Sequence, residues 1–127
     1  DYISNNNLTE KVIILGLIEH SKLIEYYSNA FAFIFPSTLE ACPHTLIEVM
    51  SCQVPMAVSN FEPMPEICTD AAIYFDPYNK KEIAQSINRL LSDNKLREQL
   101  SKSSLKRARF FDWDKSAEVL VQILGKC

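Results

Sequence analysis

The sequence predicts an α/β fold: a Rossmann-like parallel sheet with helices on both faces, followed by a helical C-terminal third. Short apolar runs alternate with segments of helical periodicity as far as Phe75, a pattern that calls for parallel strands joined by right-handed crossovers. The chain has 127 residues, of which 47% are hydrophobic and 23% charged. These values are typical of one globular domain and argue against disorder.

Four short apolar runs have the composition of buried strands. The first, Lys11–Gly16, is β-branched and closed by glycine, as expected of a strand covered on both faces. The others are Phe31–Phe35, Met56–Ser59 and Ala72–Phe75. Between them, residues 21–29 and 44–51 place apolar side chains at helical spacing, so we expect a helix in each interval.

Three helices are expected after Pro77. Asn79 and Glu82 have the spacing of a capping box at the start of the first helix. The second runs from about residue 95 to residue 109, and the third begins near Asp112. We expect Trp113 to pack rather than to stack on a base. The third helix is also expected to bury an apolar stripe, made of Ala117, Leu120, Val121 and Leu124.

Charge is distributed unevenly along the chain. The formal net charge is −3, but residues 1–79 carry −8 and residues 80–110 carry +6. The overall sign gives no attraction to nucleic acid. The basic stretch has two interpretations, a solvated helical face or a surface that touches an anionic membrane. The four scattered cysteines indicate a reducing compartment and no metal site, so we expect a cytoplasmic protein, with the inner face of the membrane as a second possible location.

The segment after the second strand carries the candidate site, because ligands bind beyond the carboxyl ends of parallel strands. Pro43 suits the first turn of a helix, so the N–H groups of His44 and Thr45 are expected to be unpaired and to attract a phosphate or diphosphate. Glu40 precedes this helix and Glu48 lies on its second turn. A carboxylate can accept two hydrogen bonds from a vicinal diol, which suits a ribose or a hexose.

Several spaced motifs occur in a recognisable order. They are Val12-Ile-Ile-Leu-Gly16, Phe33-Ile-Phe-Pro-Ser37, Glu40-x7-Glu48, Val49-Met-Ser-Cys-Gln-Val-Pro55, Pro65-Glu66, Asp70-Ala-Ala and Phe75-Asp-Pro77. This order resembles the retaining glycosyltransferases of the GT-B fold, in particular family 4, also called group 1. The resemblance extends from Lys11 to the C-terminus. It implies that the chain is part of a GT-B C-terminal domain.

The resemblance also implies roles for particular residues. Glu40 takes the place of the glutamate that lies against the donor sugar, the catalytic position, and Glu48 that of the glutamate that binds the ribose hydroxyls. The backbone amides of His44, Thr45 and Leu46 would touch the donor sugar or its diphosphate. A further set would lie by the nucleobase, made of Gly16, Leu17 and Ile18.

The resemblance further implies a nucleotide-sugar donor, a hexose transferred with retention, and a glycan or lipid-linked acceptor held by an N-terminal domain. No cofactor and no metal are expected for the transfer step. The family's arginine and lysine for the leaving diphosphate have no counterpart here, since only Lys11 precedes Gly16. We therefore expect residues 1–127 to be an incomplete nucleotide-sugar-binding domain, inactive alone and open to self-association through unpaired sheet edges.

Two departures from the family pattern concern the backbone. Ala41, Cys42 and Pro43 stand where the family commonly has glycines, and Gln53 replaces a glycine before Pro55. A positive φ at residue 53 would strain a glutamine by roughly 1 kcal/mol. Two other functions remain open: a non-catalytic docking module on a Rossmann-like sheet, and part of a GT-B nucleotide-sugar epimerase.

Overall fold

The computed structural model describes residues 2–126 and contains a three-stranded parallel sheet. The strands lie in chain order, β1 (Phe33–Phe35), β2 (Met56–Ser59) and β3 (Ala72–Phe75), with β2 in the centre. In the register, Ala57 of β2 lies opposite Ile34 of β1 and Ile73 of β3. The predicted boundaries of β2 and β3 are confirmed, and β1 is two residues shorter than expected.

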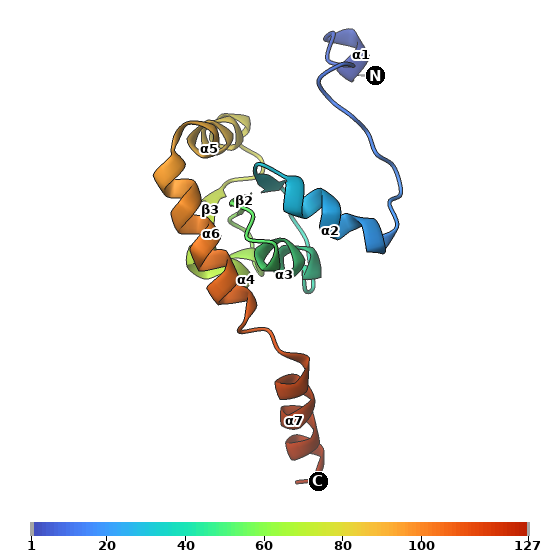
Figure 1. The fold of residues 1–127 in the computed structure, drawn as a ribbon, viewed down its shortest axis with the longest axis vertical. Coiled ribbons are helices and arrows are strands. Elements are labelled where there is room, and N and C mark those ends of the chain that lie inside the picture. The colour runs from blue at the N-terminus through green and yellow to red at the C-terminus, as the bar shows by residue number, and fades with distance from the viewer. Residues whose placement is uncertain (1, 127) are drawn as a thin grey trace.

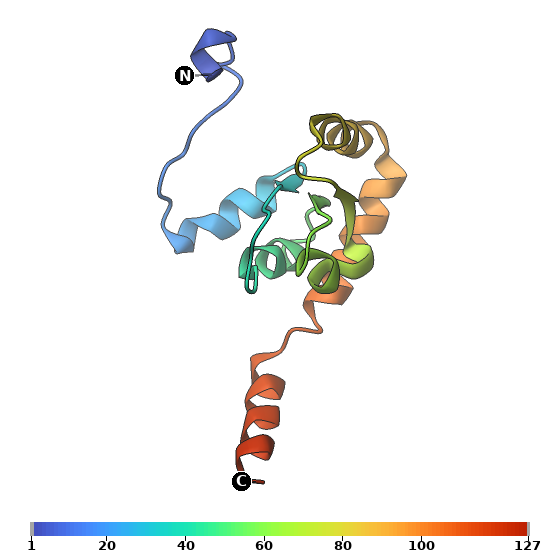
Figure 2. The same ribbon diagram turned by 180° about the vertical axis from the view of Figure 1, so that it is seen from behind.

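The helices are those expected, with short additions. They are α1 (Tyr2–Asn5), α2 (His20–Asn29), α3 (His44–Ser51), α4 (Met64–Cys68), α5 (Lys80–Ser92), α6 (Asn94–Ala108) and α7 (Trp113–Leu124), with a 3₁₀ turn η1 (Thr69–Ala71) after α4. Figures 1 and 2 show α2 to α6 gathered around the sheet, whereas α1 and α7 lie at opposite ends of the molecule.

Side chains of the central strand alternate between two apolar clusters. Met56 and Val58 belong to a cluster that includes Leu46 of α3 and Met64 of α4. Ala57 points to the opposite cluster, with Leu90 of α5 and the start of α6. Helices therefore cover both faces of the sheet, which confirms the predicted Rossmann-like architecture. The C-terminal third is helical, as expected.

The turn after α3 holds Gln53 in a backbone conformation that costs free energy for any residue but glycine. Gln53 has φ 60°, so it adopts the left-handed conformation that strains a residue other than glycine. Its N–H donates to Met50 O at 3.0 Å, and the N–H of Val54 donates to Val49 O at 3.4 Å. These two bonds form a Schellman motif, which ends a helix with a left-handed residue that is usually glycine. Val49 and Val54 are both buried in the same cluster, which secures the turn.

The predicted N-cap of α5 at Asn79 is confirmed, but the capping box is not closed, because the backbone N–H of Asn79 donates to Asp76 O at 3.0 Å and not to Glu82. The Asn79 side chain accepts hydrogen bonds from the N–H groups of Lys81 and Glu82, at 3.1 and 3.3 Å. Glu82 in turn accepts from the Asn79 side-chain amide at 2.8 Å and from the N–H of Asp76 at 2.9 Å. The exchange ties the end of β3 to the first turn of α5.

The predicted strand at Lys11–Gly16 is wrong. Residues 12–16 are an extended loop, in which Ile13 and Ile14 are 78% and 76% exposed. A strand needs a hydrogen-bonding neighbour, and β1 and β3 pair only with β2 within residues 2–126. Without such a neighbour the apolar run has the composition of a strand but not its hydrogen bonds.

The predicted burial along the last helix is also wrong. α7 forms where expected, but none of its described residues is buried. Leu120, Val121 and Leu124 are all more than half exposed, and Ala117 is exposed as well. The helix extends away from the sheet and from α2 to α6 (Figure 1). Its apolar stripe therefore packs against no facing surface in the described part of the chain.

Candidate functional site

The carboxyl ends of the three strands meet at one edge of the sheet, where the sequence places the candidate site. The N–H of Asn60, after β2, donates to Phe75 O at the end of β3 at 2.9 Å. The rings of Phe61 and Tyr78, from the two loops beyond, pack edge to face with centroids 5.7 Å apart. The loop after β1 leads into α3 and carries the predicted ligand residues.

Glu40 lies in that loop, half-buried. Ser37, two residues beyond β1, donates its hydroxyl to Glu40 Oε1 at 2.7 Å. Because Pro36 and Ser37 end the strand, this bond holds the Glu40 carboxylate close to the edge of the sheet. An ionised carboxylate keeps further acceptor sites beyond this one bond, so Glu40 retains the capacity to bind a polar ligand.

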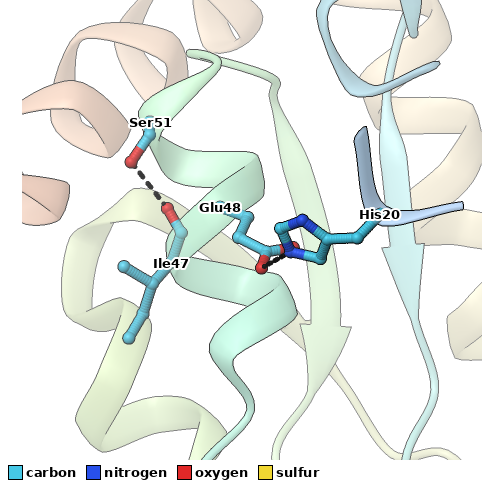
Figure 3. A network of polar contacts seen from close by, with 4 residues as sticks. All are labelled: His20, Ile47, Glu48 and Ser51. Carbon is cyan, nitrogen blue, oxygen red and sulfur yellow. Dashed lines mark hydrogen bonds and ion pairs between the residues drawn. The ribbon is translucent and has the colours of Figure 1, made fainter. Parts of the chain in front are cut away.

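Glu48 lies on the second turn of α3, with 33% of its side chain exposed. Its Oε1 atom is 3.1 Å from Nε2 of His20, the first residue of α2 (Figure 3). Sequence reasoning missed this partner, because the two residues are 28 positions apart and nothing in their local spacing joins them. Figure 3 also shows Ser51, which donates to Ile47 O at 2.9 Å along the same helix.

The N-terminus of α3 offers fewer unpaired amides than predicted. The N–H of His44 donates to Cys42 O at 2.9 Å, and that of Leu46 donates to Pro43 O at 2.9 Å. The expectation of an unpaired His44 amide is therefore wrong. Pro43 is the N-cap residue rather than part of the first turn. Within residues 2–126, the Thr45 N–H donates no hydrogen bond, so one backbone donor of this turn is available to an anion.

The side chains of the predicted amide residues have different surroundings. Leu46 is fully buried in the core, whereas His44 is exposed. Thr45 is half-buried and lies by Tyr27 of α2. Burial raises the pKa of Tyr27, the nearby Glu48 carboxylate raises it further, and a hydrogen bond from the Thr45 side chain lowers it. α2 therefore reaches the candidate site through two residues.

A pocket of about 440 Å³ opens beside α3. Its lining comes from the start of α3 with the residue before Pro43, and from the first turn of α7 with the two residues before it. These residues are Cys42, His44, Ile47, Glu48, Phe111, Asp112, Trp113 and Ser116. Two predicted ligand residues, His44 and Glu48, share this pocket, and Glu40 is not part of its wall. The expected packing of Trp113 is wrong, since Trp113 is 79% exposed. Its ring lines the pocket, with its centroid 6.0 Å from that of the His44 ring.

The predicted nucleobase residues lie in the loop before α2. Gly16 has φ +65°, Leu17 is fully exposed and Ile18 is half-buried. Their connection to α3 is indirect, through His20 two residues further along.

The described residues form neither a metal site nor a helix that could span a membrane. Between residues 2 and 126, no group of three or more His, Cys, Asp or Glu side chains is arranged to hold a metal ion. No helix in that range is long and apolar enough to cross a membrane.

Comparison with solved structures places the fold. The chain superposes on a sucrose-phosphate synthase from Thermosynechococcus elongatus with a TM-score of 0.87 and 24% identity, over 99% of this chain and 33% of that one. It also matches the C-terminal domain of a group 1 family glycosyl transferase from Francisella tularensis. There the TM-score is 0.75 with 19% identity, over 86% of this chain and 57% of that one. These likenesses establish a GT-B glycosyltransferase fold.

Sequence comparison gives the family. An O-antigen chain mannosyltransferase B from Escherichia coli is 33% identical over 79% of this chain and 26% of its own length. A second relative is an N-acetylgalactosaminyltransferase from Campylobacter jejuni, named for N,N'-diacetylbacillosaminyl-diphospho-undecaprenol. It is 30% identical over 72% of this chain and 25% of its own length. The chain thus spans about a quarter of the length of these relatives. Residues 1–107 match the family model of glycosyl transferases group 1. The chain belongs to the group 1 family of glycosyl transferases.

Proposed function

We propose that this chain is the donor-binding part of a glycosyltransferase that moves a hexose from a nucleotide sugar to a glycan or lipid-linked acceptor with retention. One observation carries the proposal: Glu40 and Glu48 flank the loop–helix junction at the carboxyl edge of a parallel sheet in a chain of the group 1 family. That edge is where such sheets bind ligands. The mannosyltransferase and the N-acetylgalactosaminyltransferase among the relatives support a hexose donor and a glycan or lipid-linked acceptor.

Glu48 is the residue that we assign to the ribose. Its carboxylate is one-third exposed and can accept hydrogen bonds from two neighbouring hydroxyls. The unpaired N–H of Thr45 lies one turn earlier on the same helix, where the helix dipole favours an anion. A nucleoside diphosphate that places its ribose at Glu48 would direct its diphosphate to this turn, with His44 beside it.

Glu40 is assigned to the donor sugar. The Ser37 hydroxyl fixes one of its oxygens, so the carboxylate presents the other at the strand end, where the sugar would follow the diphosphate. The predicted contacts of Gly16, Leu17 and Ile18 with the nucleobase stay predictions. The Leu46 amide could touch the donor only by sharing its proton with Pro43 O, to which it already donates. The location in the cytoplasm, a contact of the basic residues 80–110 with anionic lipid and self-association through unpaired sheet edges are likewise predictions.

The transfer step needs a positive group for the departing diphosphate, because negative charge accumulates on its oxygens. The ion pairs of the described residues bring no lysine or arginine to Glu40 or Glu48. We propose that another part of the enzyme supplies the cation, together with the acceptor site. The 127-residue chain would then bind nucleotide without turnover.

Calorimetric titration with UDP, GDP and ADP tests the ribose assignment. We expect one of the three to bind and Glu48→Ala to weaken that binding by about tenfold or more, because hydrogen bonds to charged groups are among the stronger ones. Glu98→Ala is the matched control, an exposed glutamate on α6, and should leave the affinity unchanged. Equal affinity of the wild type and Glu48→Ala would sink the assignment, and binding of none of the three nucleotides would favour a docking module.

A further inference from the structure

A histidine from a neighbouring helix holds the carboxylate that we assign to the ribose. His20 Nε2 lies 3.1 Å from Glu48 Oε1, with 75% of the His20 side chain and 33% of the Glu48 side chain exposed. Figure 3 shows the imidazole reaching across from the start of α2 to the second turn of α3. No other hydrogen bond to the Glu48 side chain forms within residues 2–126.

The direction of this hydrogen bond follows from the chemistry of its partners. An ionised carboxylate only accepts hydrogen bonds, so the Nε2 atom of His20 must carry the proton and donate it. The bond occupies one of about four lone-pair positions on the carboxylate. The Oε2 atom and the second lone pair of Oε1 remain available to a diol, so His20 can orient Glu48 without displacing a ribose.

The helix that carries His20 is itself held in place. Seven residues after His20, and so on the same side of α2, Tyr27 lies against the sheet with its ring edge to face with Phe33 of β1, at a centroid distance of 5.8 Å. Tyr27 also packs against the apolar cluster that includes Leu46 and Val49 of α3. α2 is therefore held against α3 at both of its ends, by His20 at the first turn and by Tyr27 at the last.

We propose that His20 is a positioning residue that fixes the Glu48 carboxylate for ribose recognition. Fixing a glutamate side chain before the ligand arrives removes part of the ordering cost of binding. His20 makes no contact with the ligand in this account, and its whole effect passes through Glu48. The inference rests on the proposed function, because it presumes that Glu48 binds the ribose.

The experiment measures the preference of the chain for ribose over deoxyribose. Affinities for UDP, GDP and ADP are compared with those for their 2′-deoxy forms in the wild type, His20→Ala, His20→Gln, Glu48→Gln and a control, Ser21→Ala. Glutamine keeps an N–H donor at a similar reach, and Ser21 is an exposed neighbour on α2. His20 is exposed, so its substitution should not disturb folding, which circular dichroism verifies.

We expect His20→Ala to weaken binding of the ribonucleotide by about three- to tenfold and to weaken that of the 2′-deoxy form less, because the deoxy form keeps only the 3′-hydroxyl for Glu48. His20→Gln should restore most of the preference, and Ser21→Ala should behave as the wild type. A ribose preference that is lost in Glu48→Gln and kept in His20→Ala would overturn the positioning role and leave the proposed function intact. A preference unchanged in Glu48→Gln would overturn the ribose assignment, and the inference with it.

A second measurement needs no ligand. Two-dimensional ¹H–¹⁵N spectra of the imidazole report which ring nitrogen carries the proton. The account predicts the Nε2–H tautomer for neutral His20, and a changed Nε2 resonance in Glu48→Gln. A wild-type spectrum that shows the Nδ1–H tautomer, or no response to Glu48→Gln, would contradict the contact.

Discussion

The body of the molecule is the sheet together with α2 to α6. Its apolar content is similar to that of the two terminal segments, residues 2–19 and 113–126, but its surroundings are different. Met56 and Val58 of β2 are fully buried between helices, whereas Ile13 and Ile14 are more than three-quarters exposed. Both pairs come from short runs rich in apolar residues. The difference is the neighbour: β2 has a strand on each side, and residues 12–16 have none within the described chain. Apolar composition alone therefore does not make a strand.

The comparison predicts that the two regions respond very differently to truncation of a leucine. Leu46 is fully buried and Leu17 fully exposed. Leu46→Ala should lower the free energy of unfolding by about 2–5 kcal/mol, because it removes buried carbons and leaves a cavity. Leu17→Ala should change it by less than about 0.5 kcal/mol. Urea unfolding monitored by circular dichroism measures both, and similar losses in the two variants would refute the division.

Helix capping offers a second contrast, with the same chemistry in both regions. The side chain of Asn79 caps α5 in the body, and that of Asp112 caps α7, which has no buried residue among those described and meets α3 only through its first turn, at the pocket. Asn79→Ala should cost about 1 kcal/mol of global stability. Asp112→Ala should leave the unfolding midpoint of the body unchanged and reduce only the helical signal. If Asp112→Ala lowered the midpoint as much as Asn79→Ala, α7 would be part of the cooperative unit.

A third prediction concerns the strained turn of the body. Gln53 ends α3 with φ 60°, where glycine avoids the clash of a Cβ atom. Gln53→Gly should therefore raise the free energy of unfolding by roughly 0.5–1 kcal/mol. Gln85→Gly, in the interior of α5, should lower it by roughly the same amount. A loss of stability in both variants would show that the turn is not strained.

The smallest effect expected is on pH dependence. The Ser103 hydroxyl donates to Asp70 Oδ2 at 3.1 Å and joins α6 to η1, and this bond lowers the pKa of Asp70 below its ordinary 3.8. Because the folded state favours the ionised form, the bond stabilises fully above that value, and its contribution is lost as the pH falls through the lower folded pKa.

Ser103→Ala should therefore reduce stability slightly at neutral pH and flatten its decline below pH 3.8. Acid titration followed by circular dichroism, with Ser101→Ala on the same helix as control, measures the difference. An identical acid profile in Ser103→Ala and the control would contradict the role of the bond.

Sequence patterns predicted correctly those elements that are determined by contacts between residues close together in the chain. The capping of α5 by Asn79 and the helix over residues 44–51 follow from local spacing, and both are confirmed. The positive φ of Gln53 is suggested by the resemblance to the family, which has a glycine there, and the structure shows it. The failures required knowledge of distant neighbours. The strand predicted at residues 11–16 lacked a partner strand, and the apolar stripe of α7 lacked a surface to pack against.

The same distinction applies to the candidate site. The motif residues Glu40 and Glu48 could be singled out from their order along the chain. The partner of Glu48 could not, because His20 comes from another helix and meets Glu48 only once α2 has packed against α3. The pairing of the His44 amide with Cys42 O depends on the path of a loop in which the family's glycines are replaced.

The most direct test of the account is a ¹H–¹⁵N titration of the uniformly labelled chain with UDP, GDP and ADP. The account predicts that the nucleotide that binds shifts the backbone amides of Thr45, Glu48 and His20 most strongly, and leaves those of α5 unchanged. Shifts centred on another part of the chain, or no shifts with any of the three nucleotides, would contradict a donor site at the junction of β1 and α3.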